Sequence, residues 1–210
     1  MVDRVLTLNN RGHNSNCVRE ASQLIKDNGF SLGLQMMTGL YGSSEEDDVY
    51  TAKEFIKLHP DTVRIYPTVV LDNTELGRLF SKGIYQTQTL TQAVDLCAEL
   101  ITMFEDVNIS VIRVGLHSSD TMQSKILSGA FHPAFRELCE GKIYLNKITE
   151  EINHKKIQQG NIIILVTPLA VSKATGQRKI NLTTLKNMGY NAKIIADPNL
   201  LQGQIIIQEG

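Results

Sequence analysis

The sequence predicts an α/β fold in which part of a parallel βα barrel is followed by a small α/β unit at the carboxyl terminus. Helical and strand patterns alternate along the amino-terminal third, and the first strand runs directly into a glycine turn, Tyr41 to Ser44. Parallel α/β folds bind ligands at that end of a strand. Only two such units are visible, so the rest of a barrel is either missing or supplied by another chain.

Four patterned segments make up the amino-terminal region: helix Cys17 to Asn28, strand Ser31 to Leu40, helix Tyr50 to Leu58 and strand Thr62 to Val70. Gly29 ends the first helix as a C-cap residue, and the acidic run Glu45 to Asp48 suits the amino terminus of the second. Pro67 cannot donate to a ladder and marks the end of the second strand. Strand, helix and strand in this order predict a parallel crossover.

The remaining segments follow the same reasoning: helices Glu75 to Lys82 and Thr91 to Phe104, strand Asn108 to Gly115, a helix from Pro133 towards Ile157, strand Asn161 to Val166, helix Leu182 to Met188, and strands Ala192 to Ala196 and Gln204 to Gln208. We therefore expect three regions: a partial barrel over 1–75, a helical and strand extension over 76–158, and a small basic α/β unit over 159–210.

Composition indicates a globular chain of 210 residues, with 42% hydrophobic and 20% charged residues. No stretch approaches the roughly 20 apolar residues of a membrane span, and the first residues lack the order of a secretory signal. We expect a cytoplasmic protein without a membrane partner. Cys17, Cys97 and Cys139 are too widely separated for a disulfide framework or a CxxC metal site, and the histidine spacing also predicts no metal site.

The charge is divided unevenly along the chain. Residues 1–151 contain 14 Lys and Arg against 20 Asp and Glu, whereas residues 152–210 contain 7 against 2. Between Ile152 and Ala196 there is no acidic residue, so this segment could engage RNA phosphates, with Arg178, Lys179 and Lys186 as the candidate contacts. The alternative is a solvated basic surface with no partner.

Six motifs, in order and spacing, resemble the radical S-adenosylmethionine family, in the branch that contains the catalytic subunit of Elongator: Asn10 to His13, Gly33 to Leu40, Val63 to Val70, Thr74 to Leu76, Gly83 to Tyr85 and His132 to Arg136. Oxygen-independent coproporphyrinogen oxidases resemble it more distantly. The similarity covers roughly residues 3–150. It implies a partial barrel of the radical S-adenosylmethionine type.

The chain departs from the family in one respect. Members bind a [4Fe–4S] cluster through a CxxxCxxC loop, and this spacing does not occur here. The resemblance is therefore to the carboxyl-terminal part of a member, with the cluster loop expected before Met1. The chain is then either a partial gene product or a degenerate relative that has lost its chemistry. Alone, it is expected to bind no cluster, and S-adenosylmethionine at most weakly.

The resemblance also implies roles for individual residues. It places Arg11 near the carboxylate of S-adenosylmethionine, and Gln35 on a barrel strand facing this cofactor. Met37 and the segment Tyr66, Pro67 and Thr68 fall where adenine packs. Without the resemblance, Arg11 is a surface residue, Gln35 a buried amide and Met37 part of the core.

Two functions remain open. In the first, the intact protein cleaves S-adenosylmethionine to a 5′-deoxyadenosyl radical, with RNA as the substrate that the Elongator branch suggests. In the second, the 210 residues form a non-catalytic α/β module that binds RNA or a protein. In either case, the exposed strand edges of a partial barrel would pair with the missing barrel portion or with a second copy.

Overall fold

The chain divides into two compact units in the computed structural model, which describes residues 1–117 and 123–210. The units are Met1–Phe135 and Arg136–Gly210. This division differs from the boundaries that the sequence suggests near residues 75 and 158. The reason is helix α7 (Phe135–Lys155), which buries Ile148 and Ile152 against the strands of the second unit rather than forming an extension of the first.

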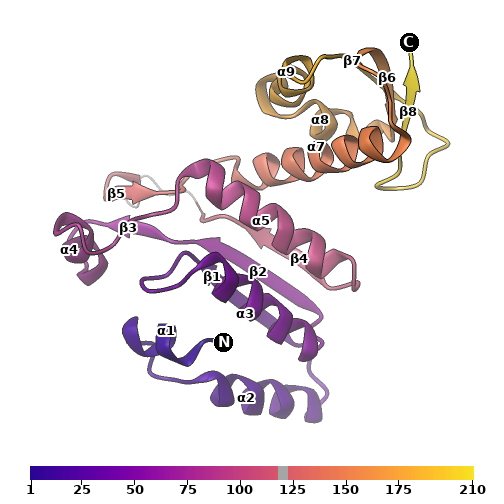
Figure 1. Cartoon of the computed structure of the whole chain (residues 1–210). Coiled ribbons are helices and arrows are strands. Elements are labelled where there is room, and N and C mark those ends of the chain that lie inside the picture. Colours follow the sequence, from indigo (N-terminus) through magenta and orange to yellow (C-terminus); the bar gives the residue numbers. More distant parts are fainter. Residues whose placement is uncertain (118–122) are drawn as a thin grey trace. The chain divides into compact units, whose positions relative to one another are not determined.

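A three-stranded parallel sheet forms the centre of the first unit. Its strands are β1 (Gly33–Thr38), β2 (Thr62–Pro67) and β4 (Ser110–Val114), in the order β1-β2-β4. The parallel pairing of β1 with β2 confirms the predicted crossover. The sheet agrees with the expected partial α/β architecture, and Figure 1 shows its strands side by side.

Two helices cover one face of this sheet. Helix α3 (Glu45–Lys57) packs on β1, α5 (Leu90–Glu105) packs on β4, and the two helices contact each other. Capping boxes at Ser44 and Thr89 fix both helix starts, so α3 begins at the acidic run and not at Tyr50. The side chains buried in this part of the chain include Met36, Phe55, Val63, Ile65, Leu100, Phe104 and Val111.

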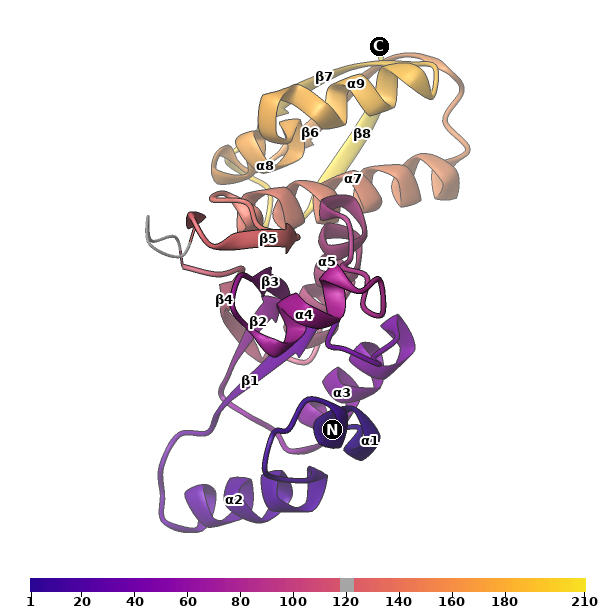
Figure 2. The same ribbon diagram turned by 90° about the vertical axis from the view of Figure 1, so that its left-hand side faces the viewer.

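Two further helices precede the sheet, α1 (Asp3–Leu8) and α2 (Ser15–Asp27). They lie beside β1 and α3 in Figures 1 and 2. Arg19 of α2 forms an ion pair of 2.7 Å with Glu54 of α3, and Arg4 of α1 pairs with Asp47. Helix α1 is not predicted from the sequence, because six residues are too few to show a helical period.

The second predicted strand is divided in two by the proline. β2 ends at Pro67, and β3 (Val69–Leu71) pairs antiparallel with β5 (Ile126–Gly129) in a separate two-stranded sheet. Helix α4 (Glu75–Ser81) follows β3. The strand β5 was not expected, because its four residues carry little pattern.

The second unit is a three-stranded sheet with helices. Strand β6 (Gly160–Val166) lies between β7 (Tyr190–Ala196), which is parallel to it, and β8 (Ile205–Glu209), which is antiparallel. The 3-10 turns η1 (Pro168–Ala170) and η2 (Gln177–Lys179) flank α8 (Val171–Thr175), and α9 (Ile180–Asn187) follows. Among the described residues, every helix is too short or too polar to cross a lipid bilayer.

A buried amide ties the helices of this unit together. The Nδ2 group of Asn181, at the start of α9, donates to the carbonyls of Gly141 at 2.8 Å, Ala174 at 3.0 Å and Lys173 at 3.4 Å. Asn181 is only 2% exposed. The amide thus connects α7, α8 and α9 through their backbone.

Asn181→Ala is expected to lower the free energy of unfolding of the second unit by about 2 kcal/mol, because buried carbonyls would lose their donor. Hydrogen exchange of the β6 amides, read by NMR, measures this loss. Asn187→Ala, at an exposed position of the same helix, is the control. Equal protection of β6 in both variants would contradict the prediction.

Candidate functional site

The face of the parallel sheet opposite α3 and α5 carries the polar side chains. Strand pairing sets Gln35 beside Arg64 and Met37 beside Tyr66. Gln35 and Arg64 are exposed, and Met37 and Tyr66 are half-buried, whereas their neighbours Met36 and Ile65 are buried under the helices. Because side chains alternate between the faces of a strand, these four residues share one face.

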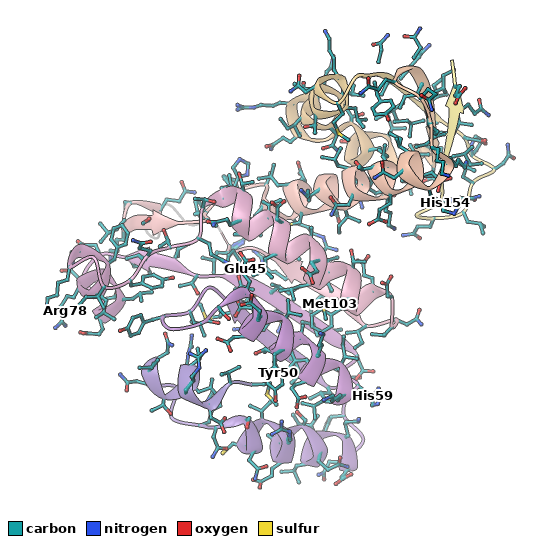
Figure 3. The ribbon with its side chains drawn as sticks, viewed as in Figure 1. Glu45, Tyr50, His59, Arg78, Met103 and His154 are labelled. Atoms are coloured by element: carbon teal, nitrogen blue, oxygen red, sulfur yellow. The ribbon has the colours of Figure 1, made fainter. Side chains whose placement is uncertain are left out.

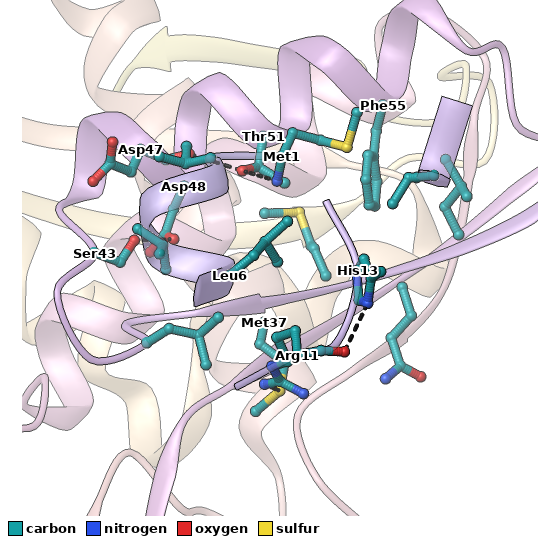
Figure 4. A pocket seen from close by; sticks show the side chains of 17 residues that line it. Met1, Leu6, Arg11, His13, Met37, Ser43, Asp47, Asp48, Thr51 and Phe55 are labelled. Atoms are coloured by element: carbon teal, nitrogen blue, oxygen red, sulfur yellow. Dashed lines mark hydrogen bonds between the residues drawn. The ribbon is translucent and has the colours of Figure 1, made fainter. Parts of the chain in front are cut away.

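Arg11 reaches this face from the loop between α1 and α2. Its Nη2 donates to the sulfur of Met37 at 2.9 Å. Nδ1 of His13 donates to the carbonyl of Arg11 at 3.0 Å, so His13 helps to shape the turn that presents the guanidinium. Figure 4 shows Arg11 beside Met37 and the contact with His13.

A hollow of about 270 Å³ adjoins these residues, between α1, β1 and α3. Its wall is largely apolar, with Met1, Leu6, Met36 and Phe55 among the contributors, and Arg11, Gln35 and Met37 also line it. Of the predicted residues, Arg11, Gln35 and Met37 thus line this hollow, and Tyr66 lies beside Met37 on the neighbouring strand β2.

Pro67 and Thr68 lie differently from these four. Both are buried. The backbone amide and the hydroxyl of Thr68 donate to the carbonyl of Thr38, at 3.0 and 2.7 Å, and so join the carboxyl ends of β1 and β2. The contact of Pro67 and Thr68 with a cofactor remains a prediction, and what the structure shows is their part in holding the strand ends together.

A buried carboxylate holds the loop that follows β1. Oδ2 of Asp48 accepts from the backbone amide of Gly39 at 2.8 Å, and Oδ1 accepts from the hydroxyl of Ser43 at 2.8 Å. The hydroxyl of Tyr85 donates to the carbonyl of Gly39 at 2.6 Å. Gly39 has a φ of +67°, which favours glycine at this turn. The loop is therefore fixed from two sides.

Burial of Asp48 has an electrostatic consequence. Loss of solvent raises the pKa of Asp48 from 3.8 to about 6, against the two hydrogen bonds that favour its charged form. Burial also raises the pKa of Tyr85 to about 12. The sequence marks Asp48 only as part of an acidic helix start, and an acidic run of this kind does not indicate which of its members is buried.

The cysteines do not form a cluster site. Cys17 is exposed on α2, Cys97 is buried on α5 and Cys139 is buried on α7. Among residues 1–117 and 123–210, no group of three or more His, Cys, Asp or Glu side chains could hold a metal ion. The described residues therefore do not fit a [4Fe–4S] cluster, which normally takes at least three thiolates from the protein.

The side chains on the open face, in contrast, are chemically compatible with the S-adenosylmethionine that the sequence resemblance implies. The Arg11 guanidinium can pair with a carboxylate, and the Gln35 amide can bond hydroxyl groups. The Met37 thioether and the Tyr66 ring offer apolar surface for an adenine. These four side chains lie on the sheet face or at its edge.

The predicted nucleic-acid contacts lie in the second unit. Arg178, Lys179 and Lys186 are exposed, and none forms an ion pair in the described parts of the chain. In contrast, Lys155 pairs with Glu151 at 2.8 Å and Lys173 pairs with Glu140 at 3.2 Å. Carboxylates of α7 therefore neutralise part of the basic segment that the sequence places over 152–196.

This chain is similar to known proteins in sequence. Residues 60–145 match the family model of the Radical_SAM C-terminal domain. Elongator complex protein 3 of Dictyostelium discoideum is 32% identical over 133 residues, which are 62% of this chain and 23% of that protein. A tRNA uridine(34) acetyltransferase of Methanocaldococcus infernus is 32% identical over 100 residues, which are 45% of this chain and 18% of that protein.

A solved structure supports the same conclusion. Elp3 of Methanocaldococcus infernus, with an N-terminal deletion of residues 1–46, superimposes with a TM-score of 0.57 at 25% identity, and the match covers 75% of this chain and 34% of that one. The similarities confirm the expected resemblance to the carboxyl-terminal part of Elongator-type radical S-adenosylmethionine proteins. The chain spans less than a quarter of the length of the two curated relatives.

Asp48 is expected to make the stability of the first unit fall as pH rises. A carboxyl group whose folded pKa exceeds its unfolded pKa stabilises the fold when protonated, so the contribution is complete below about pH 4 and is lost towards pH 6, to a total of up to about 3 kcal/mol. Asp48→Asn removes this dependence, as urea unfolding at a series of pH values would show.

Asp27→Asn, at an exposed position of α2, is the matched control and should keep the wild-type profile. The difference between wild type and Asp48→Asn isolates this group from the other carboxylates. If the two profiles run parallel between pH 4 and 7, Asp48 does not titrate as predicted.

Proposed function

We propose that this chain is the carboxyl-terminal portion of a radical S-adenosylmethionine protein whose intact form modifies RNA. The observation that carries the proposal is the open sheet face, where Arg11, Gln35, Met37 and Tyr66 come together while the opposite face is covered by helices. In a closed barrel such a face lines the interior.

The chain's part in the reaction is to bind and orient. When bound with a reduced cluster, S-adenosylmethionine supplies a 5′-deoxyadenosyl radical that abstracts hydrogen from the substrate. Arg11 would hold the carboxylate of this cofactor, Gln35 would bond its ribose, and Met37 and Tyr66 would pack its adenine. The loop fixed by Asp48 would limit water at the carboxyl end of β1.

The cluster ligands would come from a polypeptide segment outside these 210 residues. The same segment would supply the remaining barrel strands and cover the edge of β1 that has no partner strand among the described residues. RNA is proposed as the substrate because one of the similar proteins is named as a tRNA uridine(34) acetyltransferase. That name describes the relative, and its substrate comes to this chain as a proposal.

To test the proposal, the chain is expressed together with a neighbouring genomic segment that encodes CxxxCxxC. The protein is then reconstituted anaerobically with iron and sulfide. The assembled protein should form 5′-deoxyadenosine from S-adenosylmethionine. The chain alone should form none and bind no cluster. If the isolated chain binds about four irons and loses them when its cysteines are replaced, the cluster ligands do not come from a segment outside these 210 residues.

In the assembled protein, Arg11→Ala should weaken S-adenosylmethionine binding by about 1.5–3 kcal/mol, the range for hydrogen bonds that involve a charged group, and Gln35→Ala by about 0.5–1.5 kcal/mol, the range for neutral partners. Arg11→Lys should restore only part of the affinity, because an ammonium group cannot copy the planar fork of guanidinium. Calorimetric titration measures all three variants.

The control for these variants is Arg78→Ala. Arg78 projects from α4 in Figure 3, and it is 72% exposed and pairs only with Glu75 of its own helix among the described residues. Unchanged affinity in both alanine variants would show that Arg11 and Gln35 do not contact the cofactor.

A second candidate function is a non-catalytic RNA-binding module. The observation in its favour is the group of cations without ion pairs in the described part of the second unit, Arg178, Lys179 and Lys186. Lys155 and Lys173 should contribute less, because each already has a carboxylate partner.

If this surface binds RNA, log K should fall linearly with log salt, by about 0.7 for each phosphate contacted on a single strand. Replacing Arg178, Lys179 and Lys186 together with Gln should reduce that slope by roughly two units and leave the fold intact. Fluorescence anisotropy with a transfer RNA and a mixed oligonucleotide at several salt concentrations measures the slope.

Replacing Lys155 and Lys173 with Gln provides a control with two fewer positive charges. Its slope should stay nearer the wild-type value. An unchanged slope in the triple variant, or no binding by the wild-type chain at low salt, would identify the segment as a solvated surface.

A further inference from the structure

A β-bulge sets two arginines side by side on the open sheet face. Val63 is paired with Val111, but the next residue of β2, Arg64, is paired with Arg113, so Ile112 is the extra residue of β4. Without this bulge, strict alternation would turn Arg113 towards the covered face. With it, Ile65 and Val114 pair and stay buried, while Arg64 is exposed and Arg113 half-buried on the open face.

The positive charge of the two arginines is not compensated within the described chain. Adjacent strands lie about 4.8 Å apart, and like charges at opposed positions repel. Neither Arg64 nor Arg113 forms an ion pair with any carboxylate in residues 1–117 and 123–210. Arg113 donates from Nη2 to Nδ1 of His117 at 3.1 Å, and this contact brings no carboxylate to its guanidinium.

A third polar group continues the row. Gln35 of β1 is the strand partner of Arg64, so Gln35, Arg64 and Arg113 lie across all three strands. Two guanidinium forks and one amide provide many N–H donors on one surface. Such a set matches a group with several acceptor oxygens and a negative charge.

We propose that Arg64 and Arg113 form a binding site for a phosphate group, with Gln35 at its edge. Guanidinium forks bond pairs of phosphate oxygens in a bidentate manner, and two forks on neighbouring strands can engage one tetrahedral oxyanion together. The bulge that aims Arg113 is a device that recurs beside binding sites. As an anchor for an RNA substrate the site rests on the proposed function, whereas phosphate binding itself does not.

The experiment titrates the chain with inorganic phosphate and, separately, with the dinucleotide UpU at constant ionic strength. NMR signals of the arginine Nε–Hε groups report binding at each guanidinium. Arg64→Gln and Arg113→Gln should each weaken binding at least about tenfold, as expected for loss of a charge-assisted hydrogen bond. Arg64→Lys should fall between wild type and Arg64→Gln, because it keeps the charge but loses the fork.

Arg78→Gln is the matched control and should bind as wild type does. Circular dichroism checks that the variants are folded, as is expected of substitutions on an exposed face. Binding of UpU points to a phosphodiester of RNA, and binding of inorganic phosphate alone points to a terminal phosphate. Either result supports the site.

Two results would overturn it: no binding of either probe, or binding that both Gln variants retain. The assay needs neither a cluster nor S-adenosylmethionine. Its failure is therefore separate from failure to form 5′-deoxyadenosine, which would count against the proposed function alone.

Discussion

Burial of one face of the parallel sheet is the constraint on which the rest of the first unit depends. α3 and α5 cover one face of the sheet, where the apolar side chains of Met36, Val63, Ile65, Val111 and Val114 are buried. The intervening positions are free of that requirement and carry Gln35, Arg64 and Tyr66. Polar residues are tolerated on the open face because burial of apolar side chains on the other face already stabilises the sheet.

The loop after β1 adds a second constraint. A buried carboxylate on α3 and a phenol from the segment before α5 both bond Gly39. The position of the strand end therefore depends on two segments that are far apart in the sequence. The cost of burying Asp48 is visible in its raised pKa, and the hydrogen bonds it accepts from Gly39 and Ser43 offset part of that cost.

Much of this architecture was predictable from the sequence. Apolar periodicity located α5 and α7 to within a few residues, and Pro67 correctly marked the end of β2. Short elements such as α1 and β5 were not predictable, because four to six residues hold too little pattern.

The candidate site was predictable only in part. The family resemblance pointed to Arg11 and Gln35, which the structure brings to one face. Arg64 and Arg113 were missed, because the pairing between strands and the register shift at Ile112 are tertiary features. Alternation read along β4 alone would have assigned Arg113 to the covered face.

The extra residue in β4 has a consequence for how this protein can change. In a regular strand, a slip of one residue would exchange the side chains of the two faces along the whole strand. An inserted residue changes the orientation only of the residues beyond it. Val111 therefore stays buried under the helices, while the residues after Ile112 face the opposite way from what strict alternation would give. Insertion or deletion of one residue within β4 would therefore change which side chains face a ligand beyond that point.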